Sequence, residues 1–125
     1  MKYLNLILFF ACAILYGQQD TLIPTPAQNQ QMYQIIGGHL FKYFQVPQEV
    51  YENDSVSTYR YKIEFVIDEN GKVTQPQIID KNTECTSCEA EIIKILYSAP
   101  PVEPFILNDK KVQAKFILPF RLSIQ

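Results

Sequence analysis

Two cysteines three positions apart are the residues best placed for chemistry in this sequence. Cys85 and Cys88 enclose a Thr-Ser pair and stand at the start of a segment with helical periodicity. A helix amino terminus lowers the pKa of a thiol, which would suit thiol–disulfide exchange, but the βαβ pattern of thioredoxin-like redox motifs is missing. We therefore expect a structural disulfide between Cys85 and Cys88, with a redox role as the alternative.

The other polar residues do not form a catalytic set. His39 is the single histidine, and we expect it to be solvated, without a partner. Three glutamates, Glu84, Glu89 and Glu91, crowd the start of the second predicted helix, where carboxylates complement the helix dipole. No serine lies in a nucleophile elbow, and no glycine-rich loop could hold a phosphate. A zinc site needs about four ligands, and Cys85, Cys88 and His39 would supply only three. We expect no catalytic residue, no metal and no cofactor.

The amino terminus has the pattern of a secretory signal peptide. Lys2 precedes a run, residues 4–15, that is apolar apart from one asparagine, and the run ends near Gly17. It is shorter than the roughly 20 apolar residues that span a bilayer. We expect residues 1–17 to be removed and the protein to be exported. Two alternatives remain, an uncleaved amino-terminal anchor and a lipoprotein acylated on Cys12.

Removal of residues 1–17 from 125 leaves 108, which suits one domain. Residues 18–31 are predicted to be a polar, poorly ordered lead-in, followed by a domain at residues 32–125. The chain has 11 basic and 13 acidic residues, a net charge of −2. A basic stripe is absent, so nucleic acid is not expected as a partner.

Strict alternation of apolar and polar residues predicts the first strand. Asn70 and Gly71 follow it as a hairpin turn, because both residues tolerate positive φ. Residues 72–80 return as a second strand, in which Pro76 removes a backbone donor and so indicates a bulge or an edge. The apolar face of the first strand is formed by Tyr59, Tyr61, Ile63, Phe65 and Ile67.

Helical spacing of apolar residues predicts helices at about 27–44 and 84–99, and a last strand follows at about 111–124. Residues 49–57 are polar and are expected to form a loop. The order helix, strand, strand, helix, strand predicts an α+β fold. We expect a small antiparallel three-stranded sheet covered by two helices.

These elements together resemble the carboxy-terminal domain of TonB-type proteins. The matching pieces include Tyr61-Lys62-Ile63-Glu64-Phe65-Val66-Ile67-Asp68-Glu69-Asn70-Gly71-Lys72-Val73, then Glu89-Ala90-Glu91-Ile92-Ile93, Pro104 and Phe116-Ile117-Leu118-Pro119-Phe120-Arg121-Leu122. With the upstream Ile36-Gly37-Gly38, the resemblance covers roughly residues 33–124.

The resemblance implies a non-enzymatic periplasmic binding module linked to outer-membrane transport. Such a domain adds an extended segment of an outer-membrane receptor, or of another envelope protein, to its sheet edge. A homodimer formed through the same strand, as in a self-associating scaffold, is the alternative. The chain lacks the long proline-rich linker of the family's energy transducers, so an adaptor or competitor is expected. The implied edge consists of Val112, Gln113, Ala114, Lys115, Phe116, Ile117 and Leu118, and Pro119 limits pairing beyond it.

Overall fold

Three long antiparallel strands carry the fold of residues 21–124, the part of the chain that the computed structural model describes. β2 (Thr58–Ile67) lies between β3 (Val73–Lys81) and β5 (Lys110–Ser123) and pairs antiparallel with both. The α+β class predicted from the sequence is confirmed. The predicted signal peptide, residues 1–17, and the alternative lipidation site at Cys12 lie outside the described residues.

Two short strands extend the sheet beyond the three that the sequence predicts. β1 (Thr21–Leu22) pairs parallel with β5, and β4 (Phe105–Leu107) pairs antiparallel with the beginning of β5. Asn108 and Asp109 join β4 to β5 with φ values of 53° and 65°. Positive φ at both residues is the geometry of a two-residue type I′ hairpin turn. The prediction of a three-stranded sheet was wrong because strands of two or three residues carry no readable alternation.

The first predicted helix is confirmed as three consecutive segments. α2 (Pro26–Met32) and α3 (Gly38–Tyr43) are joined by a π-helical turn, η1 (Tyr33–Gly37). Thr25 begins this helix with a capping box, because its side chain accepts from the backbone of Gln28 and the Gln28 side chain accepts from the backbone of Thr25. Within the described part of the predicted lead-in, residues 21 and 22 form β1 and residues 26–31 belong to α2.

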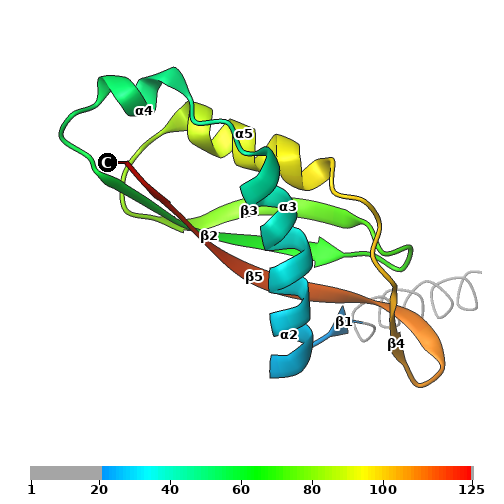
Figure 1. The fold of residues 1–125 in the computed structure, drawn as a ribbon. Helices are drawn as coiled ribbons and strands as arrows, with labels where there is room; N and C mark the ends of the chain where they lie inside the picture. The colour runs from blue at the N-terminus through cyan, green and yellow to red at the C-terminus, as the bar shows by residue number, and fades with distance from the viewer. Residues whose placement is uncertain (1–20, 125) are drawn as a thin grey trace, which may run out of the picture.

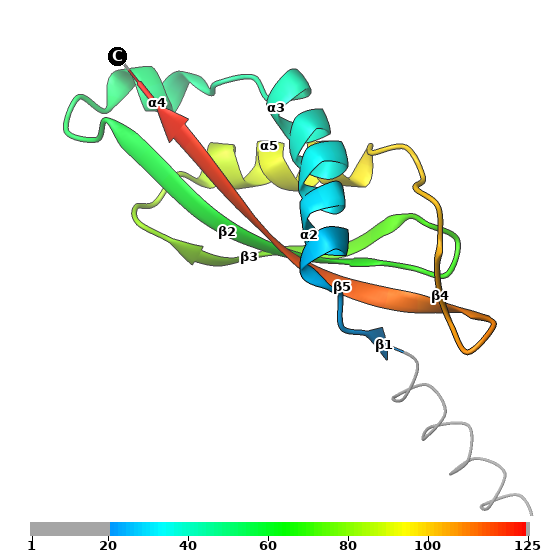
Figure 2. The same cartoon turned by 60° about the horizontal axis from the view of Figure 1, so that its bottom comes forward.

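The second predicted helix is α5 (Thr86–Tyr97), and a short helix, α4 (Gln48–Glu52), precedes β2. The sequence predicts a loop at residues 49–57, and the first part of that prediction was wrong. Pro47 fixes the entry to α4, and the buried Val50 holds it against the core. Figure 2 shows α3, α4 and α5 on the same side of the sheet. In Figure 1 the β4–β5 hairpin projects from the end of the sheet remote from the carboxyl terminus.

The core lies between the sheet and these helices, and it uses the residues that the alternation selected. All five apolar residues of the predicted β2 face are buried, as are Phe116 and Leu118 of β5. The rings of Phe65 and Phe116 stack with centroids 5.8 Å apart. The helices contribute Ile36 from η1, Leu40 from α3, and Ile92 and Leu96 from α5. Spacings of four residues place each pair on one helix face.

The turn between β2 and β3 differs from a two-residue hairpin. β2 ends at Ile67, and Asp68 Oδ1 accepts hydrogen bonds from the backbone nitrogens of Asn70 and Lys72, each at 2.9 Å. Gly71 alone in this turn has positive φ, +80°. Asn70 and Gly71 lie in the turn as predicted, but only Gly71 requires the left-handed region.

Candidate partner-binding edge

β5 has a second neighbour over only the first part of its length. Val112 pairs with Phe105 of β4, and Gln113 and Ala114 pair with the two residues of β1. From Lys115 onward β5 pairs with β2 on one side. No other strand among residues 21–124 pairs with its other side. We call residues 115–123 the open edge of β5.

This arrangement divides the segment predicted as the partner-binding edge. Val112 and Gln113 each pair with one short strand, and Ala114 pairs with both β1 and β2, so the uninterrupted open edge begins at Lys115. Within the open edge, Phe116 and Leu118 are buried in the core, whereas Ile117 is 55% exposed. Backbone groups are therefore open to a partner while alternate side chains remain fixed by the core. Partner binding at Lys115, Phe116, Ile117 and Leu118 stays a prediction.

The opposite edge of the sheet is less regular. β3 has no further strand beside it among the described residues, but its pairing with β2 contains two register shifts. Gln75 has a φ of 52°, and Pro76 lacks a backbone donor. Bulges and proline protect an edge from pairing. The pairing of β5 with β2 runs without a register shift from Ala114 to Ser123, which makes the open edge the better template for an added strand.

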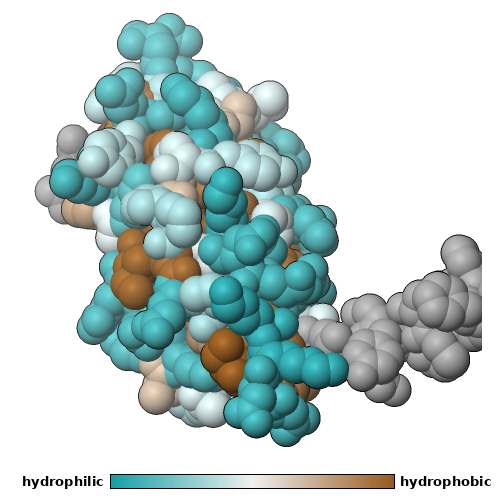
Figure 3. Space-filling view, turned by 90° about the vertical axis from the view of Figure 1, so that its right-hand side faces the viewer, coloured by the Kyte–Doolittle hydropathy of each residue, from teal (hydrophilic) through white to brown (hydrophobic). Residues whose placement is uncertain are grey.

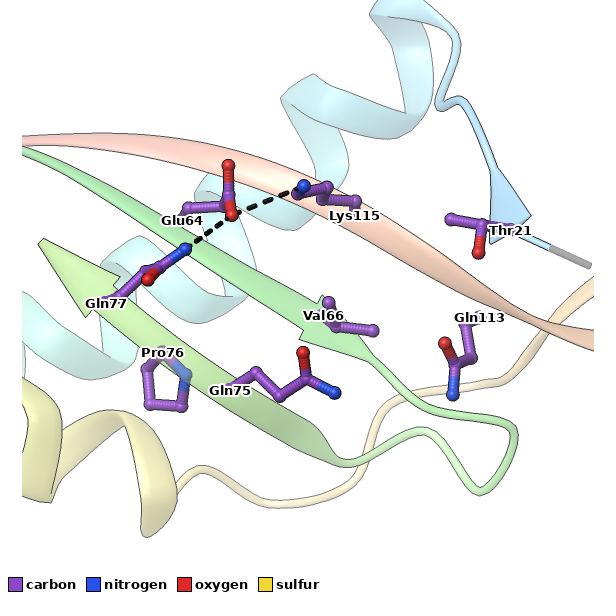
Figure 4. Close-up of a pocket in the computed structure, with 8 residues that line it drawn as sticks. All are labelled: Thr21, Glu64, Val66, Gln75, Pro76, Gln77, Gln113 and Lys115. Carbon is purple, nitrogen blue, oxygen red and sulfur yellow. Dashed lines mark hydrogen bonds and ion pairs between the residues drawn. The ribbon is translucent and has the colours of Figure 1, made fainter. Parts of the chain in front are cut away.

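A polar pocket of about 470 Å³ lies on the sheet beside the beginning of the open edge (Figure 4). The carboxylate of Glu64 on β2 accepts from Gln77 Nε2 at 2.8 Å and lies 3.4 Å from Lys115 Nζ. The three side chains connect β3, β2 and β5 across the sheet. An exposed ion pair of this kind contributes at most about 1 kcal/mol, so its main effect is to orient Lys115 towards β2.

One face of the molecule shows how exposed apolar residues are distributed. On the face in Figure 3 they form small patches separated by hydrophilic side chains. A large continuous apolar patch would favour a flat hydrophobic interface. The small patches on that face therefore do not favour such an interface.

The disulfide pair lies at the amino terminus of α5. Cys85 and Cys88 are bonded, with their Cα atoms 5.2 Å apart, and Cys85 Sγ also accepts from the backbone nitrogen of Cys88 at 3.2 Å. Their exposures are 1% and 0%, and both belong to the hydrophobic core. A thiolate must reach a sulfur to exchange with it. Burial of both sulfurs therefore favours the structural role over the redox alternative.

Charged and hydroxyl groups near the disulfide fix α4 and the start of α5. Glu49 of α4 accepts hydrogen bonds from the backbone and the hydroxyl of Ser87, and these bonds lower the pKa of its carboxyl group. Lys81 binds Glu84 and Glu89 at 3.1 Å, and hydrogen bonds to these carboxylates raise its pKa. Both glutamates thus serve in ion pairs.

Tyr61 has the one buried polar side-chain atom without a hydrogen-bond partner among the described residues. Tyr61 is 3% exposed. Its burial, with a smaller contribution from nearby carboxylates, raises the pKa of the phenol to about 12. The hydroxyl is therefore neutral at physiological pH. The Tyr61 ring stacks on that of Phe120, the residue of β5 opposite Tyr61, with centroids 6.5 Å apart, so Tyr61 belongs to the packing beneath β5.

His39 has a partner that the sequence did not indicate. Its Nε2 lies 3.2 Å from Ser98 Oγ, and that hydroxyl donates to the carbonyl of Ile95 at 2.7 Å. Because the Ser98 proton is already committed, His39 must be the donor in the first contact. Ser98 is consequently not activated as a nucleophile. The sequence did not reveal this partner, because the contact joins residues 59 positions apart.

The described residues form an α+β domain with helices on one face of an antiparallel sheet and a regular open edge. No protein-family model matches the sequence, and no curated protein matches it. Among solved structures, the chain is similar to the TonB C-terminal domain of Helicobacter pylori, with a TM-score of 0.60 and 16% identity over 80% of this chain and 87% of that one. A shorter form of the same domain gives a TM-score of 0.43 and 16% identity over 73% and 89%. The fold is that of the TonB C-terminal domain, as the sequence resemblance implied.

None of the helices formed by residues 21–124 is long and apolar enough to cross a membrane. The export and the cleavage predicted from the amino terminus concern residues outside this range.

Proposed function

We propose that this protein is a non-enzymatic binding module of the cell envelope, exported to the periplasm. It takes up an extended segment of an outer-membrane receptor, or of another envelope protein, as an additional strand on the open edge of β5. The observation that carries the proposal is the one-sided pairing of residues 115–123 in a ladder without register shifts. Strand addition uses such backbone for affinity and side-chain pockets for selectivity.

The length of the open edge limits what backbone pairing alone can achieve. Pro119 has no N–H group, so one donor is missing near the middle of this edge. Each backbone hydrogen bond contributes about 1 kcal/mol net, and binding also costs translational and rotational entropy. A few such bonds give weak association, so side-chain contacts must supply the remaining affinity.

A proline at Ile117 tests the proposal without disturbing the core. Ile117 and Pro119 are two residues apart in a regular ladder, so their nitrogens face the same side of β5. Because the ladder with β2 continues through Pro119, that side is the open edge. Ile117→Pro therefore removes a donor from the open edge only. Ile117→Thr removes comparable apolar surface and keeps the donor, which makes it the matched control.

The assay is capture of proteins from detergent-solubilised outer membranes by the purified domain, with mass spectrometry of the captured proteins. We expect outer-membrane receptors to be captured by the parent protein and by Ile117→Thr, and to be lost with Ile117→Pro. Retention of the same proteins by a folded Ile117→Pro variant would overturn the proposal. Light scattering of the purified protein is run alongside. A dimer that Ile117→Pro disrupts would replace the proposed partner by a second copy.

A further inference from the structure

A groove of about 480 Å³ runs beside the open edge of β5, between that strand and the helical residues of η1 and α3. Phe41 on its helical side is 79% exposed and Tyr33 is 49% exposed, so two aromatic side chains at the groove are not covered by the domain itself. Side chains of an added strand that point to the helical face of the sheet would enter this groove. Its lining includes Tyr33, Gly37, Gly38, Phe41, Leu118 and Arg121.

The two adjacent glycines in this groove differ in what surrounds them. A Cβ atom on Gly37 would lie 3.3 Å from Leu118 Cδ1, so its absence lets the π-helical turn approach β5 closely. A Cβ atom on Gly38 would have nothing within 4 Å. Glycine inside a helix is destabilising relative to alanine. At Gly38 no packing contact offsets that cost. The missing side chain instead leaves the groove wall open.

The two walls of the groove, which are formed by the first helix and by β5, carry basic residues and no acidic ones. Residues 26–43 and 110–123 contain no aspartate or glutamate, although the whole chain has 13 acidic and 11 basic residues. Glu64 partly neutralises Lys115 from β2, whereas Arg121 at the groove has no ion pair among the described residues. Antiparallel pairing of β5 with a second copy of itself would place like charges on facing strands, which is destabilising. The basic residues of the two walls are Lys42, Lys110, Lys111, Lys115 and Arg121.

We infer that the groove over Gly38 is a side-chain pocket for the strand that adds to β5. Its occupant is an extended segment of a partner protein that carries acidic residues and one aromatic side chain, which is seated between Tyr33 and Phe41. This inference rests on the proposed function, because strand addition brings the segment to the groove. It adds the source of selectivity: the aromatic side chain is recognised by the groove, and the acidic residues by the basic walls.

Synthetic peptides provide the probe. The first is a ten-residue peptide of alternating valine and threonine with a glutamate near each end and one phenylalanine at its centre. The second has alanine in place of phenylalanine, and the third has lysines in place of the glutamates. Each is titrated, by fluorescence anisotropy, against the parent protein, Gly38→Leu and Gly38→Ala. Leucine fills the groove and raises helix propensity, so the variant is expected to fold, whereas the alanine methyl leaves most of the groove open.

We expect the first peptide to bind the parent protein and Gly38→Ala within twofold of each other, and Gly38→Leu about tenfold or more weakly, as loss of a buried aromatic side chain requires. The alanine peptide should bind the parent protein more weakly by a similar factor and should not distinguish Gly38→Leu from it. The lysine peptide should bind more weakly still, with a gap that narrows at high salt.

The outcomes separate this inference from the proposed function. Equal binding of the first peptide to Gly38→Leu and to the parent protein, with loss on Ile117→Pro, would overturn the pocket and leave strand addition intact. Binding that is insensitive to Ile117→Pro would overturn both. A dimer that Gly38→Leu abolishes would show that a second copy occupies the groove, against the inference.

Discussion

Replacing Gly71 by alanine is expected to destabilise the domain by about 2–3 kcal/mol. The turn that contains Gly71 lies against the segment that connects α5 to β4. The backbone nitrogen of Val102 donates to the carbonyl of Gly71 at 2.8 Å. A Cβ atom on Gly71 would lie 1.8 Å from the carbonyl oxygen of Val102, so the two segments cannot keep their present separation.

Two contributions give the magnitude. The φ of Gly71 is +80°, and a residue with a Cβ atom in left-handed conformation costs about 1–2 kcal/mol. Moving Val102 away lengthens its hydrogen bond to Gly71, which is worth about 1 kcal/mol net. Their sum is the expected 2–3 kcal/mol. The change lies remote from the open edge, so strand addition by the folded fraction should be unaffected.

Urea unfolding followed by circular dichroism measures the effect. With a denaturant slope typical of small domains, the midpoint should fall by roughly 1 M or more. Gly38→Ala is the matched control, since the same methyl enters open space in a helix and should stabilise the domain by up to about 1 kcal/mol. A Gly71→Ala variant within about 0.5 kcal/mol of the parent protein would refute the reasoning, because surface changes without strain have effects of that size.

Three further predictions concern the core and its electrostatics. Reduction of the Cys85–Cys88 disulfide should lower the free energy of unfolding by about 2 kcal/mol from loop closure alone. The reductant should not change the stability of a variant with serine at both positions. A reduction potential below about −300 mV would fit an inert bridge. Stability should fall as pH rises from 10 towards 12, because burial raises the pKa of the Tyr61 phenol to about 12 in the folded state and the unfolded chain therefore loses this proton first. The variant Tyr61→Phe should show a smaller fall in stability over this pH range. Glu49→Gln should destabilise the domain at neutral pH, because hydrogen bonds from Ser87 lower the pKa of folded Glu49. The difference should shrink as pH falls below the ordinary carboxyl pKa and disappear below the lowered pKa of the folded state.

Long periodic segments were predictable from the sequence because one face of each is buried along its whole length. The alternation from Tyr59 to Ile67 matches β2, and the same argument gives β5 to within a residue or two. The cysteine pair was predictable because two thiols at this spacing, in a chain predicted to be exported, favour a bridge. In each case local pattern and tertiary burial agree.

The parts that failed depend on contacts between residues distant in the chain. Thr21 and Leu22 form β1 only because β5 is beside them, and no local signal marks a two-residue strand. The partner of His39 lies in a different helix. The limits of the open edge were hidden for the same reason: the pattern of β5 shows which side chains are buried, whereas its strand neighbours are set by β1 and β4.

The mature amino terminus decides where the open edge can act. Leu15, the last residue of the apolar run, is six residues before Thr21, a distance of at most about 20 Å. Thr21 pairs with Gln113, two residues before the open edge. An uncleaved anchor would therefore hold the edge close to the inner membrane and away from the partners that we propose, whereas cleavage after Gly17 frees the domain.

Amino-terminal sequencing and intact mass of the protein isolated from cells separate these cases. We expect a start near Gln18, because an adaptor for outer-membrane partners must be able to leave the inner membrane. An intact Met1 would contradict a free adaptor and would favour a transducer that stays beside an inner-membrane motor. A chain that begins at an acylated Cys12 would indicate a lipoprotein, whose nine residues from Cys12 to Thr21 reach at most about 30 Å from the membrane that holds it. The amino terminus that is found therefore determines how far the open edge can lie from the inner membrane. It also determines which membrane can supply the partner segment.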